Sequence, residues 1–296
     1  MKEFLTSAST RNTVGMLRNY DPNITLLILE GDSDLVTLST CLDRARCRVI
    51  VAASGKTDAI QAVEFADIEG FEGVLAIVDS DFVDIHEPRS ASANVFYTDL
   101  YDLDSSVFFA DGIVDRCVEA LVGYVRIHGQ DVHGGSAELA VSRGDAVRMA
   151  STVGFIRLYS MQGSHELPLD NFPVERVFNG QGHQVNVDEL KEILPKKCQG
   201  QTLTEGKIDE WLTRMEAEVI PAQRISQGHD LFRSLSYVVK KKWGVALKGD
   251  VWEKLARSHW RLDHMASQQL HSKVLNWSQE TGYGVWADVN WGGCGR

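Results

Sequence analysis

The sequence has few cysteines and no pattern that would pair them. Five cysteines are spread over 296 residues, no two of them form a CxxC pair, and their number is odd. These features argue against a disulfide framework and against a structural zinc site. The HExxH signature of zinc hydrolases is also missing. We therefore expect buried free thiols.

Long apolar runs are absent as well. No run approaches the roughly 18 residues that a membrane span requires, and residues 1–15 lack the apolar core of a signal peptide. We therefore expect a cytoplasmic protein without a membrane segment. Apolar side chains still make up 44% of the chain and charged ones 24%, which is the composition of a soluble globular protein.

The charge of the chain is negative but unevenly distributed. The formal net charge is −11, and residues 1–110 carry 18 Asp and Glu against 8 Lys and Arg. Residues 222–275 reverse this balance, with 10 basic and 4 acidic side chains. A chain that is acidic overall can still present a basic face to phosphates. The total charge therefore does not exclude a nucleic-acid substrate.

Strand and helix patterns alternate in the first third of the chain. The predicted strands are residues 24–30, 46–54, 73–81 and the start of 94–104. Helical spacing of apolar residues occupies 31–45, with Ser33 as the expected N-cap, and 56–68. This alternation indicates βαβ units and a mainly parallel sheet flanked by helices. The predicted fold class is therefore α/β.

The pattern changes near residue 110, where we expect a mostly helical region to begin. The predicted helices are residues 112–127, 136–150, 205–220 and 229–243, while 159–187 is predicted to be irregular. No linker-like sequence separates the two parts. We therefore predict an α/β domain over 1–110 and a helical region over 111–296 that can share its core.

Acidic side chains close two of the predicted strands. Asp79 and Asp81 end the third strand, and their period-2 spacing points both carboxylates to one face, roughly 6–7 Å apart. Glu30 ends the first strand in the same way. Ligands of open α/β sheets bind outside these carboxyl ends, and Mg²⁺ prefers a few carboxylates with retained waters. The acids predict a cleft for Mg²⁺, or alternatively Mn²⁺.

Two interpretations of these acids follow from their chemistry. Phosphodiester cleavage needs the charge stabilisation that Mg²⁺ supplies, and Glu30 could then transfer the proton as general acid/base. The other interpretation is that the acids only favour the N-termini of the next helices, by about 0.3–1 kcal/mol each. Asp32 and Asp34 fit this second role.

Five short stretches together resemble one family. "LLILEGDSD", followed some fifty residues later by "AIVDSDF", is similar to the single Glu and the Asp-x-Asp of Toprim domains. The stretches "GKTDAI", "FYTDLYDLD" and "QGHDLFRSLS" narrow the resemblance to Toprim-like nucleases of the AriB type, the effectors of the PARIS anti-phage defence system. The resemblance covers most of residues 20–110 and the patch near 228–236.

The resemblance implies a Mg²⁺-dependent endonuclease that acts as a toxic effector, with tRNA as its substrate and an ABC-type ATPase as its partner. By the family pattern, Glu30 would be the general acid/base, and Asp79 and Asp81 would bind the metal. Asp104 stands where the family usually has Glu, and its shorter side chain could still bind the ion. One active site per chain suggests that the active form is a homodimer.

Basic residues supply the remaining site predictions. Lys56 follows a strand in a loop that resembles a P-loop, but Ile50 stands where that motif needs Gly. We therefore reject ATP binding and predict either a phosphate contact or an exposed lysine without a function. His229 is predicted either to face the catalytic cleft or only to lie at the start of a helix. Lys240, Lys241 and Lys242 end the same helix and are predicted to follow a phosphate backbone, although lysines also suit a helix C-terminus.

Two other classes of function stay open. "DSDFV" also fits the first motif of haloacid-dehalogenase-type phosphatases, in which Asp79 would be the nucleophile. That family places the motif on its first strand, whereas two predicted strands precede it here. The other alternative is a non-catalytic docking subunit whose acidic N-terminal half binds an ATPase partner.

Overall fold

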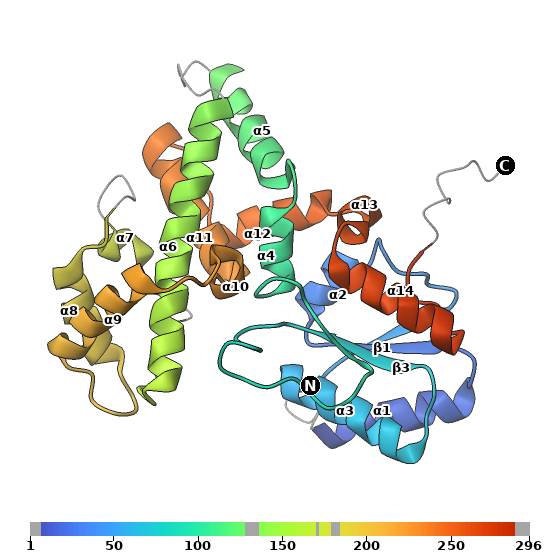
Figure 1. Cartoon of the computed structure of the whole chain (residues 1–296). Helices are drawn as coiled ribbons and strands as arrows, with labels where there is room; N and C mark the ends of the chain where they lie inside the picture. The colour runs from blue at the N-terminus through green and yellow to red at the C-terminus, as the bar shows by residue number, and fades with distance from the viewer. Residues whose placement is uncertain (1–6, 128–135, 170–171, 179–183, 288–296) are drawn as a thin grey trace. The chain divides into compact units, whose positions relative to one another are not determined.

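The computed structural model describes residues 7–127, 136–169, 172–178 and 184–287 (Figure 1). The chain divides into two units. Unit 1 consists of Met1–Ser80, Pro88–Leu103 and Arg257–Arg296, and unit 2 consists of Asp81–Glu87 and Asp104–Ala256. Each unit is therefore assembled from segments that are distant in sequence.

Unit 1 contains a four-stranded sheet with the strand order β2-β1-β3-β4. The strands are β1 (Thr25–Leu29), β2 (Cys47–Val51), β3 (Val74–Val78) and β4 (Val95–Tyr97). All neighbouring strands are parallel. The central strands β1 and β3 are buried along their whole length, because a parallel sheet is covered on both faces and these strands are apolar on both. The predicted α/β class with a parallel sheet is confirmed.

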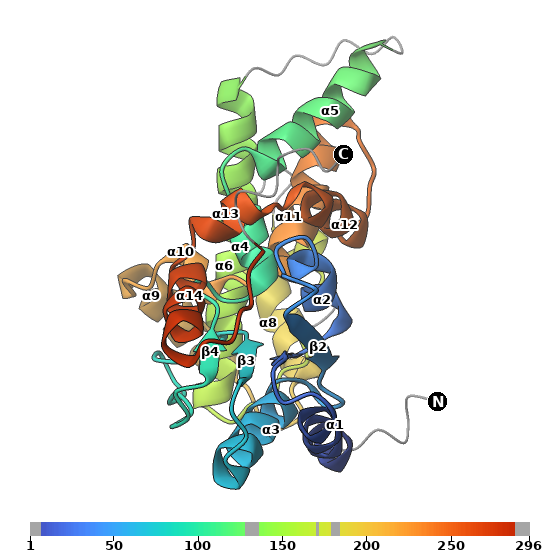
Figure 2. The ribbon, with the colours of Figure 1, turned by 90° about the vertical axis from the view of Figure 1, so that its right-hand side faces the viewer.

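Helices cover both faces of this sheet. They are α1 (Ser7–Tyr20), α2 (Asp32–Leu38), α3 (Gly55–Glu69), α13 (Leu262–Ala266) and α14 (Gln269–Thr281). α1 and α3 pack together on one face, and α2 and α14 lie on the other (Figure 1, Figure 2). The sequence predicted Ser33 as the N-cap of α2, and this prediction is wrong. The N-cap is Gly31, whose N–H donates to Asp34 Oδ2 at 3.1 Å.

The last described residues complete unit 1 beside β1. Thr25 Oγ1, at the start of β1, donates a hydrogen bond to Gly284 O at 2.8 Å. Trp286 forms an antiparallel bridge with Leu42, and α14 packs against β4. The α/β unit therefore needs residues from near the C-terminus as well as from the first third of the chain.

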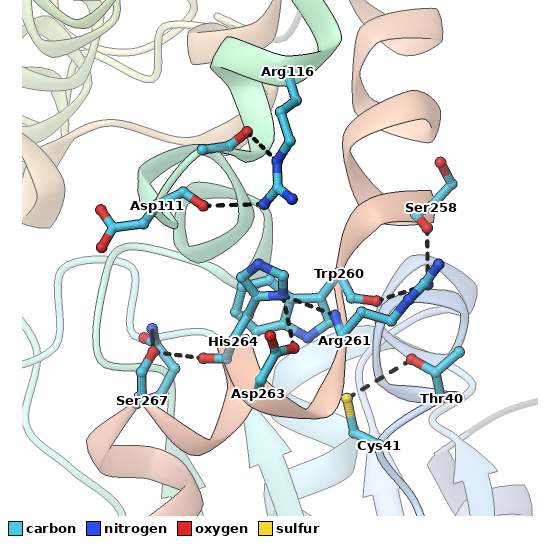
Figure 3. Close-up of polar contacts among 12 residues, drawn as sticks. Thr40, Cys41, Asp111, Arg116, Ser258, Trp260, Arg261, Asp263, His264 and Ser267 are labelled. Carbon is cyan, nitrogen blue, oxygen red and sulfur yellow. Dashed lines mark hydrogen bonds and ion pairs between the residues drawn. The ribbon is translucent and has the colours of Figure 1, made fainter. Parts of the chain in front are cut away.

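A buried tryptophan and a capping histidine anchor α13 (Figure 3). Trp260 has no exposed surface, and the His264 ring stacks on it with a centroid distance of 5.7 Å and an interplanar angle of 22°. His264 Nδ1 accepts a hydrogen bond from Arg261 N at 3.1 Å, which satisfies a backbone donor at the start of the helix. These contacts give His264 a structural role.

The described part of unit 2 is helical. Its helices are α4 (Leu103–Phe109, whose first residue belongs to unit 1), α5 (Ile113–Ile127), α6 (Ser136–Gln162), α7 (Val174–Val177), α8 (Val187–Lys197), α9 (Glu205–Ala217), α10 (Ala222–Ile225), α11 (Gly228–Trp243) and α12 (Gly249–His259, whose last turn belongs to unit 1). α6 continues beyond the predicted residue 150 because Phe155, Ile156 and Tyr159 extend its buried face. The prediction that 159–187 is irregular is therefore wrong at α6 and α7. Residues 170–171 and 179–183 of that range lie outside the described residues.

Tight contacts between helices build the core of unit 2. Phe232 of α11 packs edge to face on Phe108 of α4, with ring centroids 5.2 Å apart. Gly154 lets α10 approach α6, since a Cβ atom at this position would lie 2.0 Å from Ile225 O. A larger side chain at Gly154 would collide with the backbone, so glycine is required there.

No described helix is both long and apolar enough to cross a membrane.

No disulfide joins the described cysteines, of which Cys41, Cys47 and Cys117 are buried and Cys198 is half-buried. Burial raises the pKa of Cys47 to about 12 and that of Cys117 to about 11. The expectation of buried free thiols is confirmed for three of the four, and Cys294 lies outside the described residues.

Candidate functional site

Two of the predicted site acids meet at the carboxyl edge of the sheet in unit 1. Glu30 directly follows β1, and Asp79 directly follows the neighbouring strand β3. Glu30 Oε1 accepts a hydrogen bond from Asp79 N at 2.6 Å, and Asp79 Oδ1 accepts one from Leu103 N at 3.2 Å. Both acids are half-buried, so the pair remains partly open to solvent at the edge where ligands of α/β proteins bind.

The residue after Asp79 is held by buried hydrogen bonds. Ser80 N donates to Thr98 Oγ1 at 2.9 Å, and Ser80 Oγ donates to Thr98 O. Thr98 Oγ1 donates in turn to Leu100 O at 2.9 Å. Ser80 has no exposed surface. These bonds tie the end of β3 to the end of β4 and so fix the backbone on which Asp79 is carried.

Asp81, the second acid of the Asp-x-Asp motif, is the first residue of the unit 2 segment Asp81–Glu87. Its φ angle of 46° lies in the left-handed region, which Asp adopts more readily than most residues. Phe82, the next residue, is buried in this segment. Because Asp81 follows Asp79 by two residues, the backbone alone keeps their Cα atoms within about 7 Å.

Asp104 lies in the first turn of α4, next to the start of α11 in unit 2. A Cβ atom on Gly228 would lie 2.3 Å from Asp104 Cβ. Only a glycine therefore lets α11 begin this close to α4, and His229 is the next residue. Unit 2 thus brings two of the predicted site residues, Asp104 and His229, to the same end of α11.

The His229 ring lies between a carboxylate and a guanidinium group. Its Nδ1 lies 2.6 Å from Glu253 Oε1, and its Nε2 lies 2.7 Å from Arg233 Nη2. Arg233 can only donate, so Nε2 accepts that bond and Nδ1–H donates to the carboxylate. The hydrogen bond to Glu253 raises the pKa of His229, although burial and Arg233 oppose the shift. In this arrangement Nε2 is engaged, and proton transfer through Nε2 would require Arg233 to release it.

Glu253→Gln is expected to make the stability of the protein less dependent on pH. Because the pKa of His229 is raised in the folded state, the interaction stabilises the fold below the unfolded histidine pKa of about 6.5 and is lost as pH rises through the folded value. The variant should therefore lower the free energy of unfolding more at about pH 5.5 than at about pH 8.5. Urea denaturation measures both values, and an NMR titration of His229 should show a lower pKa.

The matched control for this prediction is Glu216→Gln, which removes an exposed carboxylate from the same unit. It should change the free energy of unfolding by a similar small amount at both pH values. An equal loss in Glu253→Gln at both pH values, with an unchanged His229 titration, would show that the contact does not set the pKa.

Lys56 and a second cation gather around the aromatic ring at the end of β4. Lys56 Nζ lies 5.8 Å from the centroid of the Tyr97 ring, and Arg89 Cζ lies 5.1 Å from it. Tyr97 is the last residue of β4, so both cations lie at the same edge of the parallel sheet as Glu30 and Asp79. Cation–π attraction holds such groups near a ring, and this places positive charge at the edge that carries the two acids.

The three predicted phosphate-binding lysines end α11. Lys240, Lys241 and Lys242 are all exposed. Lys242 Nζ donates to Ser142 Oγ at 3.2 Å, and Lys241 Nζ lies 5.7 Å from the ring centroid of Tyr237. The lysines also complement the negative end of the helix dipole. Their positions are compatible with both interpretations made from the sequence.

No group of three or more His, Cys, Asp or Glu side chains within the described part of the chain is arranged to hold a metal ion. The pair of Glu30 and Asp79 still supplies two carboxylates at one edge of the sheet. Mg²⁺ is commonly bound through one or two carboxylates and retains several waters. The donor set of this pair therefore fits a hydrated Mg²⁺ ion.

Four residues that surround the predicted site residues were not predicted from the sequence. Arg233 follows His229 by four positions, and this helical spacing could have indicated their contact. Arg89, Tyr97 and Glu253 reach the site residues only through the tertiary fold, and no local pattern marks them. Searches of protein-family models and of curated proteins found no match to this chain.

Proposed function

We propose that the chain is a Mg²⁺-dependent nuclease of the Toprim type. The observation that supports it best is the contact between Glu30 and Asp79, two acids that end neighbouring parallel strands. Asp81 and Asp104 complete the proposed set of metal ligands. When bound, Mg²⁺ would neutralise charge on the non-bridging phosphate oxygens and polarise the attacking nucleophile.

The side chains of the chain would bind the substrate and move the proton. Glu30 is the proposed general acid/base, since a carboxylate within reach of the reacting group can accept and return a proton. Lys56 would bind a phosphate group, and Lys240, Lys241 and Lys242 would attract the phosphate backbone of the substrate. His229 is proposed to assist catalysis after Arg233 releases its Nε2.

The resemblance to AriB-type nucleases supports a more specific version of this proposal. The substrate would be tRNA, and the chain would act as a toxic effector in anti-phage defence together with an ABC-type ATPase. One proposed active site per chain supports a homodimer as the active form. Each of these points is open to a direct assay on the purified chain and on its complex.

Purified protein incubated with total tRNA is expected to cleave it in the presence of Mg²⁺ or Mn²⁺ and to leave it intact with a chelator. Plasmid DNA in a parallel reaction distinguishes the substrate classes. The metal should also raise the Tm of the protein, because a ligand that binds only the folded state stabilises it. Gel electrophoresis and a thermal-shift assay measure these outcomes.

The alternatives make different predictions for the same experiment. A docking subunit would show neither cleavage nor thermal stabilisation by either metal. A phosphatase of the haloacid-dehalogenase type would release phosphate from a small phosphomonoester and leave tRNA intact. Either result, with protein that is folded by circular dichroism, would contradict the nuclease proposal.

A further inference from the structure

Unit 1 has a groove at the edge of its sheet that is distinct from the proposed active site. The groove encloses about 500 Å³ and is lined by α2, the loop after it and β2. Figure 2 shows β2 at the end of the sheet, next to α2. We call it the β2 groove. The lining residues used below are Leu35, Val36, Leu42, Val49, Arg44 and Arg48.

At the outer edge of β2, the backbone groups of alternate residues point away from the sheet, and the Cys47 N–H among them donates to Asp43 O at 2.8 Å. Thr25 N donates to Arg46 O and Ala52 N donates to Leu29 O, each at 2.8 Å. A parallel ladder uses every second residue of a strand, so residues 46, 48, 50 and 52 face β1. The N–H and C=O groups of Val49 therefore point outward. No second strand among the described residues pairs with this edge, and an edge of this kind is a template for one more strand.

The floor of the groove is apolar. Leu35, Val36, Leu42 and Val49 all line it, and Val36 is 61% exposed. Exposed apolar side chains next to an edge strand can receive the side chains of an added strand, while the backbone supplies the hydrogen bonds. The edge and the apolar floor thus favour an occupant in extended conformation with apolar residues at alternate positions.

The charge of the groove selects among possible occupants. Arg44 and Arg48 are exposed, and neither forms an ion pair with a described residue. With Arg46, they account for three of the 8 basic residues in a stretch, 1–110, that carries 18 acidic ones. A second copy of the chain paired through β2 would bring two such arginine clusters together, and like charges across strands are destabilising. An acidic segment is favoured instead.

We propose that the β2 groove binds an extended acidic segment of a partner protein, which adds to β2 as a fifth parallel or antiparallel strand. Apolar side chains at alternate positions fill the groove, and carboxylates between them contact Arg44 and Arg48. The interaction does not depend on metal binding or on cleavage. It therefore goes beyond the proposed nuclease activity and can be tested separately from it.

The test uses the full-length chain and a fluorescent synthetic peptide of about ten residues in which Val alternates with Glu. A second peptide replaces each Glu with Lys. Fluorescence anisotropy should give a Kd for the Glu peptide that is at least about tenfold lower than that for the Lys peptide. Arg44→Glu/Arg48→Glu should reverse this preference. Equal affinities for the two peptides, or an unchanged preference in the variant, would overturn the proposal.

Lys248→Glu/Lys254→Glu is the matched control variant, because it makes the same change in net charge on exposed residues of unit 2. It should leave the preference for the Glu peptide intact. If it reduces binding as much as Arg44→Glu/Arg48→Glu does, the attraction is a property of total charge, and the groove is not the binding site.

Strand addition is tested through the backbone. Val49→Pro removes an outward N–H group while leaving the ladder to β1 intact, and edge strands accept proline at such positions. It should weaken binding of the Glu peptide at least about tenfold. Because this variant could also unfold β2, a Glu peptide with N-methylated alternate residues is tested on the unchanged protein. Unaltered binding of the methylated peptide would exclude strand addition.

Two further outcomes would assign the groove to another occupant. If analytical ultracentrifugation shows a dimer that Arg44→Glu/Arg48→Glu dissociates, the occupant is a second copy of the chain. If the Glu peptide binds only to a variant that ends at Ala287, the remaining residues of the chain compete for the groove. Either result overturns the proposal of a partner segment. It is supported if Arg44→Glu/Arg48→Glu leaves the oligomeric state unchanged and truncation leaves the affinity unchanged.

Discussion

Glu30→Gln is expected to reduce the proposed nuclease activity by at least about a hundredfold while the protein stays folded, because general acid/base groups contribute about 10²–10⁴-fold. The amide oxygen of Gln can still accept the hydrogen bond from Asp79 N that Glu30 accepts at 2.6 Å. The variant therefore removes the charge and the proton-accepting group but keeps the local contact. Cleavage of total tRNA with Mg²⁺ measures the loss.

Asp79→Asn should have an effect of similar size, because it removes a charge that would bind the metal. Its amide oxygen can still accept from Leu103 N, as Asp79 Oδ1 does at 3.2 Å, while the charge that would bind the metal is lost. Thermal stabilisation by Mg²⁺ should disappear together with cleavage. Glu69→Gln, at an exposed position at the end of α3 in the same unit, is the matched control and should retain both. Wild-type cleavage by either site variant would refute the proposed roles.

Asp230→Ala is expected to lower the free energy of unfolding by about 3–5 kcal/mol. Asp230 Oδ2 lies 2.7 Å from Arg157 Nη2, and the exposed fractions of these side chains are 1% and 16%. The pair joins α11 to α6, which pack together in the core of unit 2. Removing the carboxylate leaves the partly buried Arg157 guanidinium without this counter-charge, and the cost of desolvating the ion is then no longer offset. Urea denaturation measures the change.

Two further variants show whether burial is the cause. Arg157→Met/Asp230→Leu should recover most of the lost stability, because apolar residues of similar volume can replace a buried ion pair at little cost. Glu210→Ala removes one partner of an exposed pair with the same 2.7 Å separation, and it should cost less than about 1 kcal/mol. The explanation would be contradicted if Arg157→Met and Asp230→Leu each lowered the free energy of unfolding strongly and the double variant lowered it by their sum.

The α/β core could be predicted because the local sequence pattern is enough to identify its strands. Residues 25–29 and 74–78 are buried at every position, and a continuous apolar run is what a strand covered on both faces requires. The return of α14 to β4 could not be predicted in this way. It depends on contacts such as the 2.7 Å hydrogen bond from Trp277 Nε1 to Asn94 Oδ1, and no local pattern links residues that lie so far apart in the chain.

The candidate site also has one part that local motifs predict and another part that only the tertiary fold reveals. The meeting of Glu30 and Asp79 follows from a general rule about the carboxyl ends of parallel strands, so two short motifs were enough to predict it. The environment of His229 depends on Glu253, which comes from another helix. Helical spacing could indicate Arg233, but only the tertiary fold brings the acid to the imidazole and raises its pKa.

The attachment of Gly284 and Trp286 to the first strand and its neighbouring loop has a consequence for biosynthesis. Ribosomes deliver the chain from its N-terminus, and domains tend to fold as their segments emerge. Here the segment that carries Glu30 is made well before Gly284 and Trp286, whose contacts complete the unit. The α/β unit that carries Glu30 and Asp79 is therefore completed only after the chain has been synthesised as far as Trp286.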